Sequence, residues 1–401
     1  MIERHPFEER NPMECSTKVR VLDKHLSFGL SLASYLEEGN LSVSPLNIMI
    51  ALAMLYEGAT RETAEQIAKV AKIDTTRLTR HEGFKQLTDA LNPTNAAYTL
   101  KCANALWVDN GFPINSEFKG ILEDCYKAQV YPADFQGNPR QEELRINQWV
   151  KERTEGKILK VFSEGSIDPL TGLILPNVLY FKASWRNRFN PKYTQEQDFT
   201  LSSGKVVSVN MMRKGEVESR RKLPKFQYHK NDIAQTLVLP YKGGKLFNVI
   251  ILPDEGVSTK CLESYLKGGK AKAFGLNGET HETEFSRLEL PVHELRTSCD
   301  LKEPLRRMGI ERLFCDNAQL DKMYSESVVG PPLYVKSIKH QTYFKTNEEG
   351  SEGAAVTFPE VVALDGGGPL PAEFVVERPF IEAVVDKLGN VLFLNRVEDP
   401  R

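Results

Sequence analysis

The residues with the most informative spacing lie near the end of the chain, in the stretch NEEGSEGAAVTF at 347–358. In a strand, successive side chains point to opposite sides of the sheet. Because protein interiors are close-packed, a strand that enters an existing sheet needs small residues on the side that meets the core. The pattern therefore indicates strand insertion, with a flexible Gly/Ala loop as the alternative. The small residues on that side are Ser351, Gly353, Ala355 and Thr357.

The sequence contains none of the common patterns that mark an enzyme. It lacks G-x-S-x-G, G-x-x-x-x-G-K-[ST], H-E-x-x-H and a G-x-G-x-x-G that follows a strand. His281-Glu282 is followed by Thr-Glu-Phe, so the second histidine of a zinc-protease helix is missing. The seven histidines show no recognisable Ser/His/Asp order. We therefore predict that the chain is not an enzyme and uses no cofactor or metal.

Composition and charge are those of an ordinary globular protein. Of 401 residues, 41% are hydrophobic and 26% charged, enough for a sizeable core. The 52 basic and 54 acidic residues give a net charge of −2, which argues against a nucleic-acid partner. The densest basic stretch, residues 213–225, is interrupted by Glu216 and Glu218. It indicates a solvated face, with weak polyanion binding as the alternative.

The cysteines and the N-terminus bear on the compartment. Six cysteines lie far apart without a C-x-x-C pair, so free thiols are expected, as suits a reducing compartment. The first residues are polar and lack the apolar core of a signal peptide, and no run of about 18 apolar residues follows. We expect no membrane span, and either cytoplasmic residence or leaderless export to the extracellular space.

Helical patterns dominate the first part of the chain and strand patterns the rest. A first helix is expected to be capped by Ser16 or Thr17 and stopped by Gly39. Pro45 opens a second helix that is apolar almost all round and therefore buried. No linker or repeat interrupts the chain, so we predict one α+β domain whose first and last segments need each other. Further helices are expected at 63–70, 81–91, 117–127 and 142–154, and strands from about residue 171.

Several segments, in order along the chain, resemble the serpin family of serine protease inhibitors. The stretch 347–358 is similar to the hinge of the family's reactive loop, which inserts into a sheet as a strand. The other segments are similar to the second-helix signature, the fourth helix, the helix across the main sheet, the strand ending in the breach tryptophan and the terminal strand pair. They lie at 40–67, 81–87, 145–158, 175–189 and 377–400.

The resemblance implies a fold and a domain organisation. It implies an α+β serpin fold: a single large domain with about nine helices, three β-sheets and an exposed reactive-centre loop. The domain would span 17–401 after a polar extension at 1–16, with the loop at about 348–378. Within the family the chain resembles the leaderless ovalbumin-type group, and we expect a monomer.

The partner implied by the resemblance is a target serine protease. In the family, the protease attacks a bond in the loop and forms an acyl-enzyme through its own serine. The cut loop then inserts as a central strand before hydrolysis finishes, which traps the protease in a covalent complex. The alternative is a non-inhibitory serpin that acts as a carrier or chaperone. Such members typically carry bulky, charged or proline residues on the inserting side of the hinge, whereas Ser351, Gly353 and Ala355 are small.

The hinge of the family maps onto residues 348–355, and the reactive bond follows it. Counting from Glu348 places the attacked residue at Leu364, whereas counting back from Pro379 places it at Gly368. We prefer Leu364, followed by Asp365, because the length of the inserting segment is mechanically constrained. A leucine fits the apolar primary pocket of chymotrypsin- or elastase-like proteases, with Val362 or Ala363 as next choices for an elastase. The hinge residues are Glu348, Glu349, Gly350, Ser351, Glu352, Gly353, Ala354 and Ala355.

The resemblance also implies residues that let the main sheet open. Trp185 matches the breach, where insertion begins. The sequence departs from the family pattern at five places. Asn47 replaces a serine of the shutter, Ala183-Ser184 replaces Gly-Lys before the breach tryptophan, and Asn395 replaces a glycine of the closing strand. Gly353 replaces an alanine of the hinge, and Pro359 lacks a ladder donor. We therefore expect slower trapping rather than its loss. The shutter residues are Ser44, Asn47, Asn177 and His340.

Overall fold

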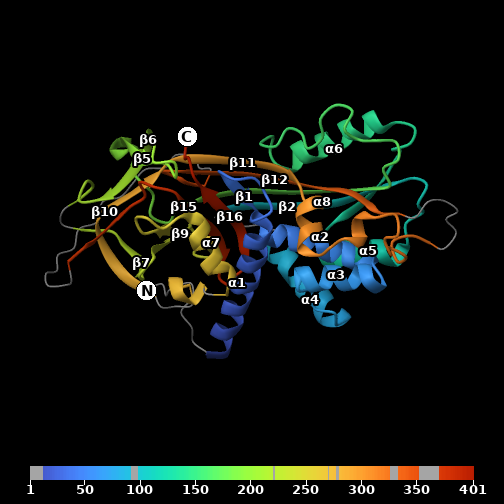
Figure 1. Cartoon of the computed structure of the whole chain (residues 1–401), viewed down its shortest axis with the longest axis horizontal. Coiled ribbons are helices and arrows are strands. Elements are labelled where there is room, and N and C mark those ends of the chain that lie inside the picture. Colours follow the sequence, from blue (N-terminus) through green and yellow to red (C-terminus); the bar gives the residue numbers. More distant parts are fainter. Residues whose placement is uncertain are drawn as a thin grey trace.

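Eight α-helices lie within the part of the chain that the computed structural model describes, residues 12–91, 98–219, 222–269, 271–276, 280–325, 333–351 and 370–401 (Figure 1). Helices are confirmed at every expected place, but α1 begins at Pro12 and ends at Ala33, so the cap expected at Ser16 or Thr17 and the stop expected at Gly39 are both wrong. Proline is favoured in the first turn, where its missing N–H costs nothing. The helices are α1 Pro12–Ala33, α2 Pro45–Gly58, α3 Arg61–Ala71, α4 Arg77–Leu91, α5 Ser116–Tyr126, α6 Pro139–Arg153, α7 Thr259–Lys267 and α8 Lys302–Met308.

A six-stranded sheet forms one layer of the molecule, in the order β11-β12-β13-β4-β2-β3. Helix α6 covers its outer face, where Ile146 and Val150 pack against side chains of β2 and β4 (Figure 1). The short strand β13 pairs with both β12 and β4. The strands are β2 Tyr98–Asp109, β3 Gln129–Ala133, β4 Leu173–Ser184, β11 His293–Asp300, β12 Val335–Asn347 and β13 Gly350–Ser351.

A ten-stranded sheet forms the second layer, in the order β1-β16-β15-β9-β8-β7-β10-β6-β5, with β14 beside β10. Strand β10 pairs with β7 through its first half and with β6 and β14 through its second half. The sheet thus consists of two halves joined through β10. Counted separately, these halves and the six-stranded sheet make the three sheets that were expected. The strands are β1 Leu41–Val43, β5 Gln195–Thr200, β6 Val206–Gly215, β7 Lys225–Lys230, β8 Ala234–Pro240, β9 Leu246–Pro253, β10 His281–Pro291, β14 Ala372–Val375, β15 Phe380–Asp386 and β16 Val391–Val397.

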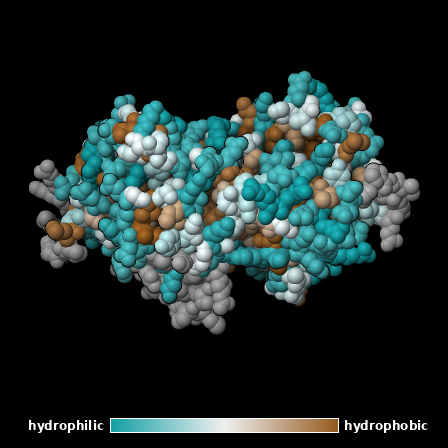
Figure 2. Space-filling view, viewed as in Figure 1, coloured by the Kyte–Doolittle hydropathy of each residue, from teal (hydrophilic) through white to brown (hydrophobic). Residues whose placement is uncertain are grey.

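The main hydrophobic core lies between the two sheets and around α2. Every residue of α2 except Tyr56 is buried, as its apolar composition predicts. The helix contacts β16 of one sheet and β4 of the other. The outer surface in Figure 2 is mostly hydrophilic, with apolar residues in scattered patches. Among the described residues, no helix combines the length and the apolar character needed to cross a membrane.

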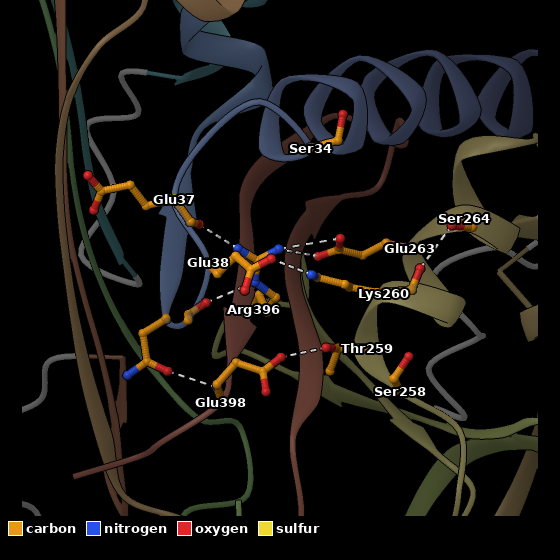
Figure 3. A network of polar contacts seen from close by, with 12 residues as sticks. Ser34, Glu37, Glu38, Ser258, Thr259, Lys260, Glu263, Ser264, Arg396 and Glu398 are labelled. Carbon is orange, nitrogen blue, oxygen red and sulfur yellow. Dashed lines mark hydrogen bonds and ion pairs between the residues drawn. The ribbon is translucent and has the colours of Figure 1, made fainter. Parts of the chain in front are cut away.

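Arg396 of β16 ties the end of the chain to its beginning (Figure 3). Its guanidinium donates to the carbonyl oxygens of Gly39 and Glu37, each at 2.8 Å, and to the carboxylate of Glu263 on α7 at 3.1 Å. Burial raises the pKa of Glu263, and the positive charge of Arg396 opposes that rise. Two more contacts join the same segments: Lys260 with Glu38, and Thr259 with Glu398. The first and last segments therefore complete each other, as the sequence predicts.

Candidate functional site

Strands β4 and β12 lie side by side and run parallel in the middle of the six-stranded sheet. We call their line of contact the seam. The direct pairing ends at Tyr180 of β4 and Tyr343 of β12. Beyond that point, Gly350 and Ser351 lie between the two strands and pair antiparallel with both. The seam is therefore already open at one end and holds the first two residues of an intervening strand.

Gly350 fits this position because it has no side chain. Its φ of +146° is one that other residues rarely adopt. A Cβ atom there would lie 2.0 Å from the carbonyl oxygen of Ala183. The backbone N–H groups of Glu349 and Gly350 both donate to Oδ1 of Asn347, at 3.1 and 3.2 Å. A tight, glycine-dependent turn thus leads from β12 back into the seam.

Ser351 is buried, with 1% of its surface exposed. Its hydroxyl is hydrogen-bonded to the phenol of Tyr241, at 2.7 Å. Tyr241 is fully buried and follows β8 in the ten-stranded sheet. The small residue predicted at this position therefore lies inside the protein, with its single polar group satisfied. No sequence pattern pointed to Tyr241 as the partner.

Trp185 lies where the breach was predicted, at the open end of the seam. Its indole N–H donates to the carbonyl oxygen of Asn347, and its backbone N–H donates to that of Glu349, both at 2.8 Å. The indole stacks on the ring of Tyr241, with centroids 4.6 Å apart and planes 8° from parallel. The stacked pair thus contacts the turn before β13 through Trp185, and Ser351 of β13 through Tyr241.

Glu348 is held at the start of the hinge by two contacts. The hydroxyl of Thr194 donates to its Oε1 at 2.6 Å. Its carbonyl oxygen accepts a hydrogen bond from the backbone N–H of Phe189 at 2.9 Å. Both partners belong to the segment between β4 and β5, which the sequence did not mark. The hinge therefore begins from a fixed anchor.

The four residues predicted as the shutter meet in one buried cluster across the seam. His340 of β12 lies beside Asn177 of β4 in the strand register. Its Nε2 accepts from the backbone N–H of Ser44 at 3.2 Å, so Nδ1 carries the proton and donates to Oδ1 of Asn177 at 2.6 Å. The hydrogen bond from His340 to Asn177 crosses the seam. It must break if β4 and β12 separate there.

Asn47 connects this cluster to α2 and β2. Its Nδ2 donates to the carbonyl oxygen of Val178, and its Oδ1 accepts from Nδ2 of Asn104 at 2.7 Å and from the thiol of Cys102 at 2.6 Å. Asn177 in turn donates to Oδ1 of Asn104 at 2.6 Å. The longer side chain of Asn47, in place of the usual serine, therefore reaches two residues of β2. Sequence reasoning missed both, because only the strand register places them here.

The His340 imidazole is neutral in this environment. Burial lowers its pKa to about 3, although the hydrogen bond with Asn177 favours the charged form. A proton on Nε2 would also face the N–H group of Ser44, which is itself a donor. A second histidine, His25, behaves in the same way: burial and then the charge of Lys24 lower its pKa to about 3. Neither ring can be protonated without loss of its native contacts.

We expect the free energy of unfolding to fall as the pH is lowered through 6.5. In the unfolded chain both histidines take up a proton near pH 6.5, whereas in the folded chain they stay neutral down to about pH 3. The contribution of these two neutral histidines to the free energy of unfolding is therefore fully present above pH 6.5. It is lost progressively as the pH falls from 6.5 to about 3. Each histidine lowers the free energy of unfolding by about 1 kcal/mol as the pH falls from 6.5 to about 5.5. Urea unfolding of the chain and of His340→Gln would measure this, and an equal loss in both would contradict it.

The reactive bond predicted at Leu364 and Asp365 lies outside the described residues. So do the later hinge residues, Glu352, Gly353, Ala354 and Ala355. The chain is described again from residue 370, and β14 pairs parallel with β10. The loop assignments therefore stay predictions, although both ends of the loop join strands of the fold.

The basic stretch of β6 and β7 is largely paired with glutamates. Arg213 donates to the buried carboxylate of Glu289 at 2.7 Å. Lys214 is buried beside Glu218, and Lys225 lies 3.1 Å from a carboxylate oxygen of Glu284. These contacts pair Arg213, Lys214 and Lys225 with acidic side chains. Within the same described part of the chain, no cluster of three or more histidine, cysteine or acidic residues is arranged to hold a metal ion.

Comparison with known proteins gives the same family throughout. The family model described as Serpin (serine protease inhibitor) matches residues 24–400. A leukocyte elastase inhibitor of Bos taurus is 34% identical over 376 residues, which cover 92% of this chain and 96% of that protein. The crystal structure of Serpin48 from the insect Tenebrio molitor is 28% identical, with a TM-score of 0.82 over 98% of this chain and 100% of that one.

The likeness extends to an ovalbumin-type structure. Uncleaved ovalbumin, at 24% identity, shares the fold with a TM-score of 0.82 over 96% of this chain and the whole of that one. The family model, the sequence relatives and the solved structures all match nearly the whole chain. The chain belongs to the serpin family, and within it resembles the ovalbumin type.

Proposed function

We propose that the chain is a suicide-substrate inhibitor of chymotrypsin- or elastase-like serine proteases. The observation that carries the proposal is the position of β13 between β4 and β12. The two outer strands run parallel, so one strand antiparallel to both can fill the seam along its length. The relative named leukocyte elastase inhibitor supports the choice of protease class.

The proposed reaction takes place on the protease, and this chain supplies the bond. The protease serine Oγ attacks the carbonyl carbon of Leu364 and forms an ester, while the bond to Asp365 breaks. The serine proton passes to the new amino group of Asp365. Residues that follow Ser351 then enter the seam, and the protease is carried along before water hydrolyses the ester. The chain itself contributes no catalytic group.

Mixing the chain with chymotrypsin or with a neutrophil-type elastase tests this proposal. We expect a covalent complex that survives SDS, together with a released fragment that begins at Asp365, because the ester forms before insertion. Gel electrophoresis and mass spectrometry would detect both. Heat-inactivated protease and protease already acylated at its serine serve as controls. Cleavage of the loop without any complex would contradict the proposal and favour a non-inhibitory role such as carrier or chaperone.

A further inference from the structure

A buried carboxylate joins the two sheets beside the open end of the seam. Glu382 of β15 is fully buried and accepts hydrogen bonds from four side chains. Asn248 of β9 donates at 2.5 Å and Asn395 of β16 at 3.1 Å, both from its own sheet. His293 of β11 lies 3.1 Å away through Nε2, and Thr346 of β12 donates at 3.3 Å. The last two belong to the six-stranded sheet.

Hydrogen-bond acceptors face both ring nitrogens of His293. Its Nε2 faces the carboxylate of Glu382, and its Nδ1 lies 3.1 Å from the carbonyl oxygen of Pro291. Both neighbours only accept hydrogen bonds, so a neutral ring would leave one nitrogen lone pair facing an oxygen. Burial would raise the pKa of Glu382, but the charge of His293 and the hydrogen bonds from His293, Asn248 and Asn395 outweigh it and lower the pKa. The two groups form an ion pair.

Aromatic rings surround this pair. The ring centroid of His293 lies 6.3 Å from that of Phe344 and 5.7 Å from that of Phe380. Phe344 also packs against Phe393, at 5.1 Å. In such apolar surroundings a charge that loses its partner is strongly unfavourable. The pair therefore resists any movement of β11 and β12 away from the ten-stranded sheet.

The same cluster reaches the docked part of the hinge. Thr346, which donates to Glu382, is the cross-strand partner of Ser351 and also of His293. Ser351 is hydrogen-bonded to Tyr241. Burial and then the charge of Glu382 raise the pKa of Tyr241 well above its ordinary value, so the carboxylate lies within electrostatic reach of that phenol. Tyr241 is the titratable group that approaches the pair from the segment after β8.

We propose that His293 and Glu382 are a positioning pair for loop insertion: they hold β12, through Thr346, at the spacing from β4 at which residues 350–351 fit between the strands. The inference rests on the proposed function, because insertion is the step that the spacing serves. The five cluster residues belong to β9, β11, β12, β15 and β16. The cluster therefore fixes the β12 side of the seam and contains no residue of β4.

The test uses the double variant His293→Gln/Glu382→Gln. It removes both charges together, which avoids an unpaired buried charge, and the glutamine amide at 293 can still donate to residue 382. We expect exchange of the Gly350 and Ser351 amide protons to become at least roughly tenfold faster, because the docked strand opens more often. We also expect more loop cleavage per trapped protease, at an unchanged rate of cleavage. Hydrogen exchange by mass spectrometry and the stoichiometry of inhibition measure these effects.

The matched control is Glu294→Gln/Lys345→Gln, whose parent residues are cross-strand partners on the same two strands. It should leave both readouts unchanged. Thr346→Val keeps both charges and removes the contact to Glu382, so it should also speed the exchange of Gly350 and Ser351. Unchanged exchange in both Thr346→Val and the double glutamine variant would overturn the inference. If the unaltered chain traps no protease, the proposed function fails, and the exchange measurement still decides the role of the pair.

Discussion

Ser351→Arg is expected to turn the chain from an inhibitor of serine proteases into a substrate. Ser351 is buried between β4 and β12, and its hydroxyl is hydrogen-bonded to a buried tyrosine. An arginine there would have to lose its hydration without a compensating partner, which costs several kcal/mol. Each 1.4 kcal/mol changes the balance between trapping and hydrolysis tenfold, so the trapped fraction should fall roughly 100-fold or more.

The measurement compares complex formation with loop cleavage for the same protease. The variant should give no SDS-resistant complex, while mass spectrometry should still find cleavage after Leu364, because the bond itself is unchanged. Ser202→Arg is the matched control: it adds the same charge at an exposed turn between β5 and β6 and should trap as well as the parent chain. Full trapping by Ser351→Arg would mean that inhibition does not depend on insertion.

Segments with strong local patterns could be predicted from the sequence. The apolar run after Pro45 predicted a buried helix, which is α2. The small residues after Glu348 predicted an inserting segment, and its described residues Gly350 and Ser351 form β13. Helices α7 and α8 were missed because only strands were expected after about residue 171. A local signal was present: Ser258 accepts a hydrogen bond from the backbone N–H of Cys261, and Leu262 and Leu266 repeat at helical spacing.

The polar contacts between distant segments could not be predicted. Asn395 was noticed only as a departure from glycine, because its partner Glu382 lies in a segment that reads as an ordinary apolar strand. Asn104 joins the shutter cluster only because β2 pairs with β4 in one particular register. A sequence gives the face on which a residue lies, whereas these contacts depend on which strands become neighbours.

Cutting the loop is expected to raise the melting temperature of the chain. β4 and β12 are paired directly over most of the seam, and of the described residues 350–351 lie between them. A strand that fills the seam gains hydrogen-bonding partners on both sides, each worth about 1 kcal/mol net. Ordering the loop costs about 1–2 kcal/mol per residue, and burial of apolar side chains offsets part of that cost. A surplus of several kcal/mol would raise the melting temperature by roughly 5 °C or more, because a chain of this length has a large entropy of unfolding.

Calorimetry before and after limited proteolysis measures this change. Ser351→Arg, cut at the same bond, is the control: its loop is severed but the charge keeps it out of the seam, so its melting temperature should not rise. The comparison separates insertion from any effect of the cut itself. A cut parent chain that melts at the same temperature as the uncut one would contradict insertion. The seam would then be an ordinary pair of parallel strands, and the docked residues 350–351 only the end of a turn.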